Sequence, residues 1–138
     1  MAIEGRFISG WLPFIFAKFI CDTLEVNKDI LLVVDTGTAT TTINEFDARE
    51  MKIDYSKLTR NNDSLGIGGP VESYLADSCH LYFGEGIKSI DIKPVKFLRQ
   101  VNIEKVDQEH YPSLLGMDVL RHYNISFAES KVILSPRS

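Results

Sequence analysis

The chain has 138 residues, of which 44% are hydrophobic and 25% are charged, a composition typical of one soluble globular domain. This composition excludes a disordered chain, a collagen and a coiled coil. Fifteen Lys and Arg residues against nineteen Asp and Glu residues leave a formal net charge of −4, which disfavours nucleic acid as a partner.

The most apolar stretch, residues 11–21, contains Pro13 and Lys18. It is also shorter than the roughly 20 residues that a membrane-spanning helix needs. The N-terminal residues show no pattern of a secretory signal. We therefore expect a cytoplasmic protein without a membrane partner, folded as a single domain over residues 1–138.

Two cysteines, Cys21 and Cys79, could form at most one bridge, whereas small secreted domains that depend on disulfides usually carry several. We expect both thiols to be reduced and to lie in the core or half-buried. His80, His110 and His122 follow no zinc-binding spacing, so the sequence predicts neither a metal site nor a cofactor.

The first part of the chain favours strands followed by one short helix. Residues 14–20 are rich in aromatic and β-branched side chains, and residues 30–34 are an unbroken apolar run, so both predict strands. The β-branched residues 40–43 predict another. Asn44 is a suitable N-cap for a helix over residues 45–51, which has two acidic residues in its first turn.

The middle of the chain predicts a hairpin with a glycine tip. Residues 59–64 are polar and predict a loop, and the glycine-rich residues 65–70 predict a tight turn. A long strand is expected over residues 71–83. After a turn at residues 84–86, residues 87–97 alternate well between apolar and polar side chains and predict a further strand.

The last part predicts a short strand, a helix and a closing hairpin. The polar, acidic residues 100–112 predict a connection, and a strand then ends at Gly116. Apolar side chains recur at helical spacing over residues 117–123. Residues 125–127 and 132–134 predict the hairpin, so the expected fold class is all-β (mainly β) with two short helices.

Asp35 ends the apolar run and is followed by Thr36, Gly37 and Thr38. A charge at the end of a buried strand is costly unless polar groups surround it. Gly37 permits a turn that brings backbone N–H groups toward the carboxylate, and the threonine hydroxyls can donate hydrogen bonds. An isolated Asp-Thr-Gly also fits a simple Asx turn, so its neighbours along the chain decide the interpretation.

Three motifs occur in one order along the chain. They are the apolar strand into Asp35-Thr36-Gly37-Thr38, the segment Gly66-Ile67-Gly68-Gly69, and Ser113-Leu114-Leu115-Gly116-Met117-Asp118. With this order and spacing, the chain resembles the retropepsin-like aspartic proteases, the single-lobe relatives of pepsin, over nearly its whole length. The resemblance implies a single closed, barrel-like lobe with a glycine-tipped flap hairpin.

The resemblance also implies roles for particular residues. Asp35 is the catalytic acid, and Thr36, Gly37 and Thr38 support the active-site loop around it. The flap over an extended peptide substrate is formed by Gly66, Ile67, Gly68 and Gly69. The strand that ends at Gly116 packs beneath the active-site loop.

A pepsin-like mechanism needs two aspartates that share one proton. The sequence has one Asp-Thr-Gly, and Asp118 lies in the context of a helix start, which does not match. Two carboxylates roughly 3 Å apart repel by about 5 kcal/mol at an effective dielectric constant of about 20, so one proton stays between them. The resemblance therefore requires a homodimer in which two Asp35 residues meet on a two-fold axis.

Ala39 and Met117 stand where viral members of the family carry an acid and an arginine that pair with each other, and Pro70 differs from the viral flap. These departures place the chain with the cellular and prokaryotic members. The leading functional hypothesis is a homodimeric aspartic endopeptidase. The alternatives are a non-catalytic peptide-binding domain of the same fold and a purely structural β-domain.

Overall fold

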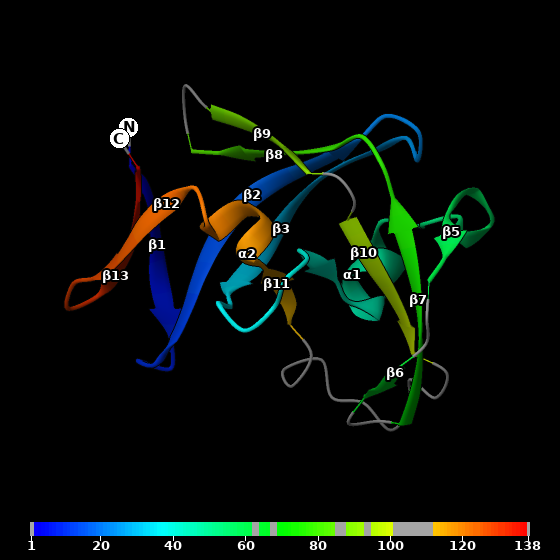
Figure 1. The fold of residues 1–138 in the computed structure, drawn as a ribbon, viewed down its shortest axis with the longest axis horizontal. Coiled ribbons are helices and arrows are strands. Elements are labelled where there is room, and N and C mark those ends of the chain that lie inside the picture. Colours follow the sequence, from blue (N-terminus) through cyan, green and yellow to red (C-terminus); the bar gives the residue numbers. More distant parts are fainter. Residues whose placement is uncertain are drawn as a thin grey trace.

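The computed structural model describes residues 2–61, 64–66, 69–84, 88–92, 95–100 and 112–137. Strands dominate these residues (Figure 1). The strands are β1 (Ile3–Ile8), β2 (Leu12–Cys21), β3 (Val26–Val34), β4 (Thr42–Ile43), β5 (Thr59–Arg60), β6 (Ser64–Gly66), β7 (Gly69–Ala76), β8 (Cys79–Phe83), β9 (Lys88–Ile92), β10 (Val95–Gln100), β11 (Ser113–Leu115), β12 (Tyr123–Phe127) and β13 (Lys131–Pro136). The helices are α1 (Glu45–Glu50), α2 (Met117–Leu120) and the 3₁₀ turn η1 (Tyr55–Lys57). The mainly β fold class is confirmed.

The described strands form one sheet in the order β12-β13-β1-β2-β3-β11-β4-β10-β7-β5, with β6 beside β7 and with β8 between β2 and β9. Figure 1 shows β1, β12 and β13 on one side of the molecule and β7 and β10 on the other, with α2 between them. Among the described residues this path does not close, because β12 lies at one end and β5 at the other. The lobe is therefore open where the sequence predicts a closed barrel.

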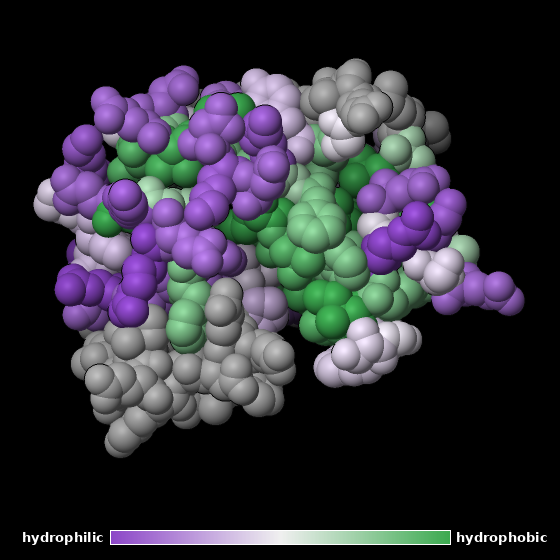
Figure 2. All heavy atoms as spheres, turned by 180° about the vertical axis from the view of Figure 1, so that it is seen from behind, coloured by the Kyte–Doolittle hydropathy of each residue, from purple (hydrophilic) through white to green (hydrophobic). Residues whose placement is uncertain are grey.

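The core follows from the alternation of side chains along β2. Ile15, Ala17, Phe19 and Cys21 are buried on one face of the strand, whereas Phe16 on the other face is 64% exposed. Apolar side chains also gather on the face of the molecule that lies behind the view of Figure 1, where hydrophilic side chains surround them (Figure 2). The sheet thus carries both an apolar core and an apolar outer band.

The middle of the sheet positions the loop that follows β3. β11 pairs in parallel with β3, with Leu115 beside Val34, and also pairs with β4 through Leu114 and Thr42. The end of β3 therefore lies next to the end of β11, although the paired residues Val34 and Leu115 are 81 positions apart in sequence. Helix α1 begins directly after β4, and its N-cap is Asn44 as predicted, since the Asn44 side chain accepts a hydrogen bond from the Asp47 amide at 2.7 Å.

The long strand expected over residues 71–83 is in fact two strands. β7 ends at Ala76 and β8 begins at Cys79, and Ser78 between them has a φ of 59°, which turns the chain. β7 pairs with β10, whereas β8 pairs with β2 and β9. Both segments are rich in β-forming residues, so their composition does not reveal the change of partner.

Other boundaries differ for similar reasons. The segment 87–97 is divided between β9 and β10, and residues 59–60, expected in a loop, pair with β7 as β5. Helix α2 stops at Leu120 because Tyr123, which has helical spacing in the sequence, begins β12. The sequence did not predict β1, in which Gly5 is buried so closely that an added Cβ would lie 2.1 Å from the Phe14 carbonyl oxygen.

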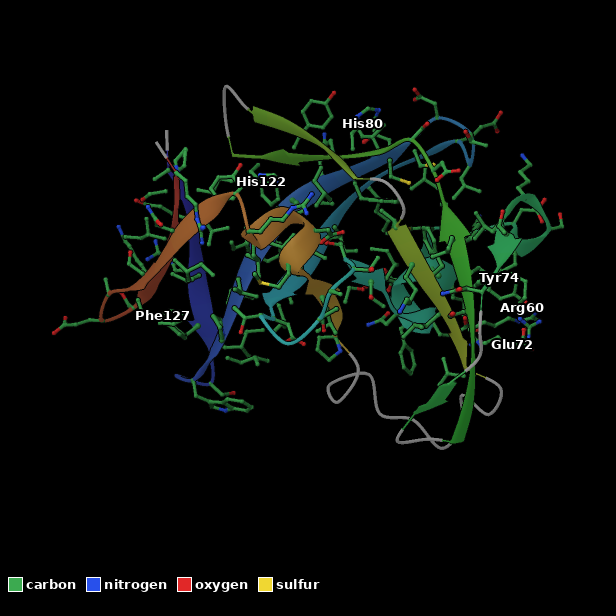
Figure 3. All side chains as sticks on the ribbon, in the orientation of Figure 1. Arg60, Glu72, Tyr74, His80, His122 and Phe127 are labelled. Atoms are coloured by element: carbon green, nitrogen blue, oxygen red, sulfur yellow. The ribbon has the colours of Figure 1, made fainter. Side chains whose placement is uncertain are left out.

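Side chains on β5 and β7 hold this edge of the sheet together (Figure 3). The Tyr74 hydroxyl donates a hydrogen bond of 2.6 Å to Glu72 Oε2, and the Arg60 guanidinium lies 5.3 Å from the centre of the Tyr74 ring. Arg60 also pairs with Glu72 at 3.6 Å. These contacts explain how a segment that reads as a polar loop becomes a short strand. Among the described residues no helix is long and apolar enough to cross a membrane.

Candidate active site

Asp35 directly follows β3, and its carboxylate accepts one hydrogen bond at each oxygen. The Gly37 amide donates to Oδ1 at 2.8 Å, and the Thr38 hydroxyl donates to Oδ2 at 2.8 Å. The side chain is half-buried, so one part of the carboxylate remains open to water. The structure thus supplies the donors that a charge at the end of an apolar strand requires.

The loop around Asp35 has the tight form that its sequence suggests. The Thr38 amide donates back to the Asp35 carbonyl at 3.3 Å, and a Cβ added to Gly37 would lie 3.2 Å from Asp35 Oδ1. Gly37 therefore allows the close approach of its amide to the carboxylate. Thr36 is exposed, and among the described residues its side chain makes no hydrogen bond to the Asp35 carboxylate.

β11 and the Gly116 that follows it pack against this loop, as the resemblance implies. The Asp35 amide donates to the Leu115 carbonyl at 3.1 Å, and the Met117 amide donates to the Thr38 carbonyl at 2.7 Å. A Cβ added to Gly116 would lie 2.8 Å from the Thr38 carbonyl oxygen and 3.0 Å from the Thr41 amide nitrogen. The two loops touch backbone to backbone, and only glycine fits at this point.

Asp118 is a supporting residue that the sequence did not reveal. Its carboxylate accepts hydrogen bonds from the Thr41 amide at 2.9 Å and from the Thr41 hydroxyl at 2.7 Å. The Thr41 hydroxyl in turn accepts from the Gly116 amide at 3.1 Å. Thr41 and Asp118 thus join the far end of the Asp35 loop to the start of α2. Because the two residues are 77 positions apart, a single sequence gives no signal that they interact.

A second tie, also not predicted, links α1 to β11. The Ser113 hydroxyl donates to Asp47 Oδ2 and accepts from the Asn44 amide at 3.0 Å. Ser113 is 1% exposed and Asn44 is 5% exposed. Burial raises the pKa of Asp47, and its neighbour Glu50 adds to the rise, while the hydrogen bond from Ser113 and the charge of Lys28 oppose it.

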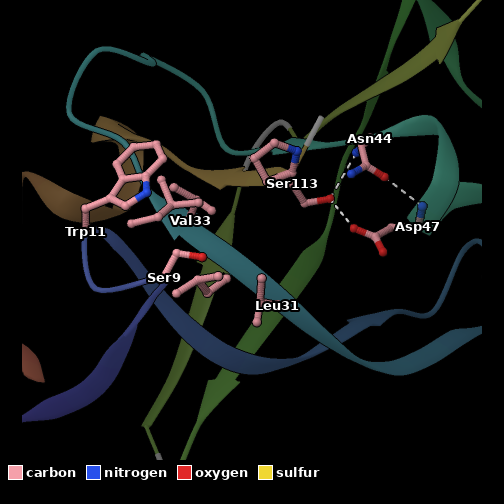
Figure 4. Close-up of a pocket in the computed structure, with 10 residues that line it drawn as sticks. Ser9, Trp11, Leu31, Val33, Asn44, Asp47 and Ser113 are labelled. Atoms are coloured by element: carbon pink, nitrogen blue, oxygen red, sulfur yellow. Dashed lines mark hydrogen bonds between the residues drawn. The ribbon is translucent and has the colours of Figure 1, made fainter. Parts of the chain in front are cut away.

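This second tie borders a pocket of about 450 Å³ on the outer face of β3 (Figure 4). Most of its wall is apolar, and its polar side chains include Asp47 and Ser113. The lining residues are Ile8, Ser9, Trp11, Leu12, Leu31, Val33, Asn44, Asp47, Pro112 and Ser113. Trp11 lies beside Val33 in Figure 4 and is 71% exposed. Val33 is two residues before Asp35, so the pocket begins close to the carboxylate along the strand.

The structure describes the predicted flap only in part. Gly66 ends β6 and Gly69 begins β7, and the two are paired in register, as in a hairpin. Ile67 and Gly68, predicted at the tip, lie outside the described residues. The closing of a flap over a substrate stays a prediction.

The cysteines and histidines singled out in the sequence are not part of the Asp35 loop. Cys21 and Cys79 are both free thiols in the core, as predicted. His80 lies on β8, and His122 lies between α2 and β12 (Figure 3). His110 lies outside the described residues.

An open β lobe with Asp-Thr-Gly at the end of a buried strand, backed by a glycine-ended strand, defines a retropepsin-like fold. The family model for gag-polyprotein putative aspartyl proteases matches residues 24–122. The chain belongs to this family of aspartyl proteases.

A solved structure agrees with the fold. The chain is similar to a retropepsin-like aspartic protease from Rickettsia conorii, with a TM-score of 0.64 and 20% identity, over 97% of this chain and 98% of that one. It is also similar to EIAV protease complexed with the inhibitor HBY-793, with a TM-score of 0.49 and 15% identity, over 80% of this chain and 86% of that one. A search of curated proteins found no match.

Proposed function

We propose that this chain is an aspartic endopeptidase that hydrolyses extended polypeptides as a homodimer. The observation that carries the proposal is the setting of Asp35. Its two oxygens are oriented by the Gly37 amide and the Thr38 hydroxyl, each at 2.8 Å, and the carboxylate is not sealed from water. A fixed carboxylate that water can reach is what a general base for hydrolysis requires.

Hydrolysis needs a second carboxyl group, and a second copy of the chain would supply it. Asp118 lies in the same loop network, but its oxygens accept hydrogen bonds from Thr41 and from the Val119 amide. It therefore braces the loop. Two copies related by a two-fold axis would bring one Asp35 from each protomer to a shared site.

In the proposed reaction, one Asp35 is ionised and the other carries the shared proton. The ionised Asp35 takes a proton from a water molecule, whose oxygen attacks the scissile carbonyl carbon, while the protonated Asp35 gives its proton to the carbonyl oxygen. The tetrahedral diol then collapses and its carbon–nitrogen bond breaks. The Asp35 that took the proton from water gives it to the amine nitrogen, and a hydroxyl of the diol gives its proton to the other Asp35. The pair returns to its starting state with one proton.

The pocket beside β3 supports binding of a peptide with apolar side chains. Leu31, Val33 and Trp11 line it, and an extended peptide that crosses Asp35 could place a side chain there. Trp11 is also the single tryptophan of the chain. Its fluorescence therefore offers a direct signal of peptide binding in this pocket.

The decisive experiment compares Asp35→Asn with the wild type and with Asp29→Asn. Asp29 is exposed on the same strand, so the control makes the same chemical change outside the site. Each protein is incubated with an unfolded protein substrate at several acidic and neutral pH values, with and without pepstatin. We expect wild type and Asp29→Asn to produce fragments and Asp35→Asn to produce none, because an amide is neither a base nor a proton carrier.

Binding is measured on the same proteins by Trp11 fluorescence with an apolar peptide. Asp35→Asn should still bind, since it keeps the pocket. If the wild type binds but never cleaves, the chain is a non-catalytic peptide-binding domain. Cleavage that persists in Asp35→Asn would show that another residue performs the chemistry.

A further inference from the structure

Cys21 and Cys79 face each other across two neighbouring strands. They are register partners in the antiparallel pair of β2 and β8, and both are 0% exposed. Both thiols point to one acceptor, the Asp77 carbonyl oxygen, at 3.9 Å from Cys21 Sγ and 3.8 Å from Cys79 Sγ. The two sulfur atoms therefore share one small buried space at the end of β2.

The backbone geometry of this pair suits a covalent bond. Directly opposed residues in antiparallel strands have Cα atoms about 4.5–5.5 Å apart. Disulfides usually join residues whose Cα atoms are about 4.4–6.8 Å apart. The strand pairing thus brings the two cysteines to bonding range with their side chains on the same buried face.

We propose that Cys21 and Cys79 are a modification site at which a small disulfide oxidant, such as glutathione disulfide, forms an intrachain bond between β2 and β8. One cysteine thiolate attacks a sulfur of the oxidant, and one glutathione thiolate leaves. The second cysteine thiolate attacks the mixed disulfide, the Cys21–Cys79 bond forms, and the second glutathione leaves. The chain loses two electrons and two protons, and the oxidant is reduced to two thiols.

Burial makes this reaction depend on opening of the fold. It raises the pKa of Cys79, and hydrogen bonding to Cys21 raises it further, so the closed structure holds this thiol in its unreactive form. An oxidant reaches the sulfurs only when β8 separates from β2. Oxidation is therefore slow in the folded chain and fast while the chain refolds.

The bond would fix one particular part of the fold. Cys79 begins β8, directly after the two residues that separate it from β7. β7 pairs with β6 at Gly66 and Gly69, so the bond would tie the base of this glycine-ended hairpin to β2. This inference rests on the cysteine pair alone and does not depend on the proposed protease activity.

The test is an equilibrium with glutathione buffers, read by intact mass and by gels without reductant. Wild type is equilibrated in buffers in which an increasing fraction of the glutathione is oxidised, once under folding conditions and once in high urea. We expect one intrachain disulfide bond per chain. The ratio of chains with this bond to chains with two free thiols should be at least about ten times higher in the folded protein than in urea. The oxidised protein should also melt at a higher temperature, and dithiothreitol should reverse the change.

Cys21→Ser and Cys79→Ser are the controls, with the Ala variants as substitutes if a Ser variant fails to fold. Each should take up at most one glutathione per chain and show no rise in melting temperature. If the ratio of disulfide-bonded to reduced chains were the same in urea and in folding buffer, the proposal would be overturned, because the fold would then contribute nothing to the bond. Wild type that carries two glutathiones per chain, or bonds between chains only, would overturn it as well.

Discussion

Thr38 is the residue whose side chain orients Asp35 from within the same loop. Its hydroxyl is one of two donors to the carboxylate, at 2.8 Å from Oδ2. Hydrogen bonds to charged groups contribute about 1.5–3 kcal/mol. The hydroxyl at this position therefore matters for activity more than the size of the side chain.

Thr38→Val keeps the shape of the side chain and removes the donor. On the proposed mechanism, we expect kcat/KM for a peptide to fall about tenfold or more, with the melting temperature changing little. Thr38→Ser keeps the hydroxyl and should retain most of the activity. Equal activity of Thr38→Val and wild type would mean that the Gly37 amide alone is sufficient to orient Asp35.

Asp47 makes the stability of the folded chain depend on pH. Because burial is the largest influence, its pKa in the folded chain is raised from the ordinary value of 3.8. The folded state thus keeps the proton to a higher pH than the unfolded chain, and ionisation of Asp47 lowers stability as the pH rises above 3.8. This loss is absent when Asn replaces Asp.

We expect the free energy of unfolding of Asp47→Asn, relative to wild type, to increase between acidic and neutral pH. Asn can still accept the hydrogen bond from Ser113, so the comparison isolates the charge. Urea unfolding at a series of pH values measures the difference, with Asp29→Asn as an exposed control. A constant difference across the series would contradict the raised pKa.

Two elements, the Asp35 loop and the turn from β11 into α2, form one unit through their backbones. Gly116→Ala would force its new methyl group against backbone atoms of residues 38, 40 and 41, the nearest at 2.8 Å. Backbone atoms cannot move aside as the end of a side chain can. We expect a loss of about 1–3 kcal/mol in the free energy of unfolding.

Gly37→Ala is the matched comparison, because among the described residues its new methyl group meets only Asp35 Oδ1, at 3.2 Å. We expect a smaller loss of stability than in Gly116→Ala, and a clear loss of cleavage because the carboxylate must shift. Chemical unfolding measures the stability of both variants, and cleavage of a peptide measures their activity. The reverse order of stabilities would mean that Gly116 is not in the close contact described above.

The sequence predicted those elements whose signal is local. The apolar run before Asp35, the Asn44 cap and the closing hairpin were all found at their expected places. The strand break at Ser78 was not predicted, because it depends on which distant strands β7 and β8 pair with. Within the site, Asp35 and Gly116 were recognised from motifs, whereas Asp118 was recognised only as an acid at a helix start.

For the molecule as a whole, the proposed mechanism requires that two copies share one site. Wild type mixed with an equal amount of Asp35→Asn, and allowed to exchange subunits, forms about a quarter wild-type, a half mixed and a quarter mutant dimers. Mixed dimers lack one carboxylate and should be nearly inactive. Activity should therefore fall to about half that of the same amount of unmixed wild type.

Tagged copies confirm the exchange, and dilution of wild type provides an independent check. Specific activity should fall once the protein concentration drops below the dimer dissociation constant, as for any site built from two subunits. If subunits exchange and activity stays at its unmixed level, each chain carries a complete site. The requirement for a homodimer would then be wrong.

The place of β1 in the sheet bears on how the chain is made. β1 pairs with β2 on one side and with β13 on the other, where Ile3 lies opposite Leu134. On the ribosome, β2 emerges directly after β1, but β13 emerges only about 120 residues later. Until then one edge of β1 keeps its backbone donors and acceptors unpaired, and such an edge can capture a strand of another nascent chain. Aggregation should therefore begin at β1, and weaker expression, which leaves fewer incomplete chains present at the same time, should increase the yield of soluble protein.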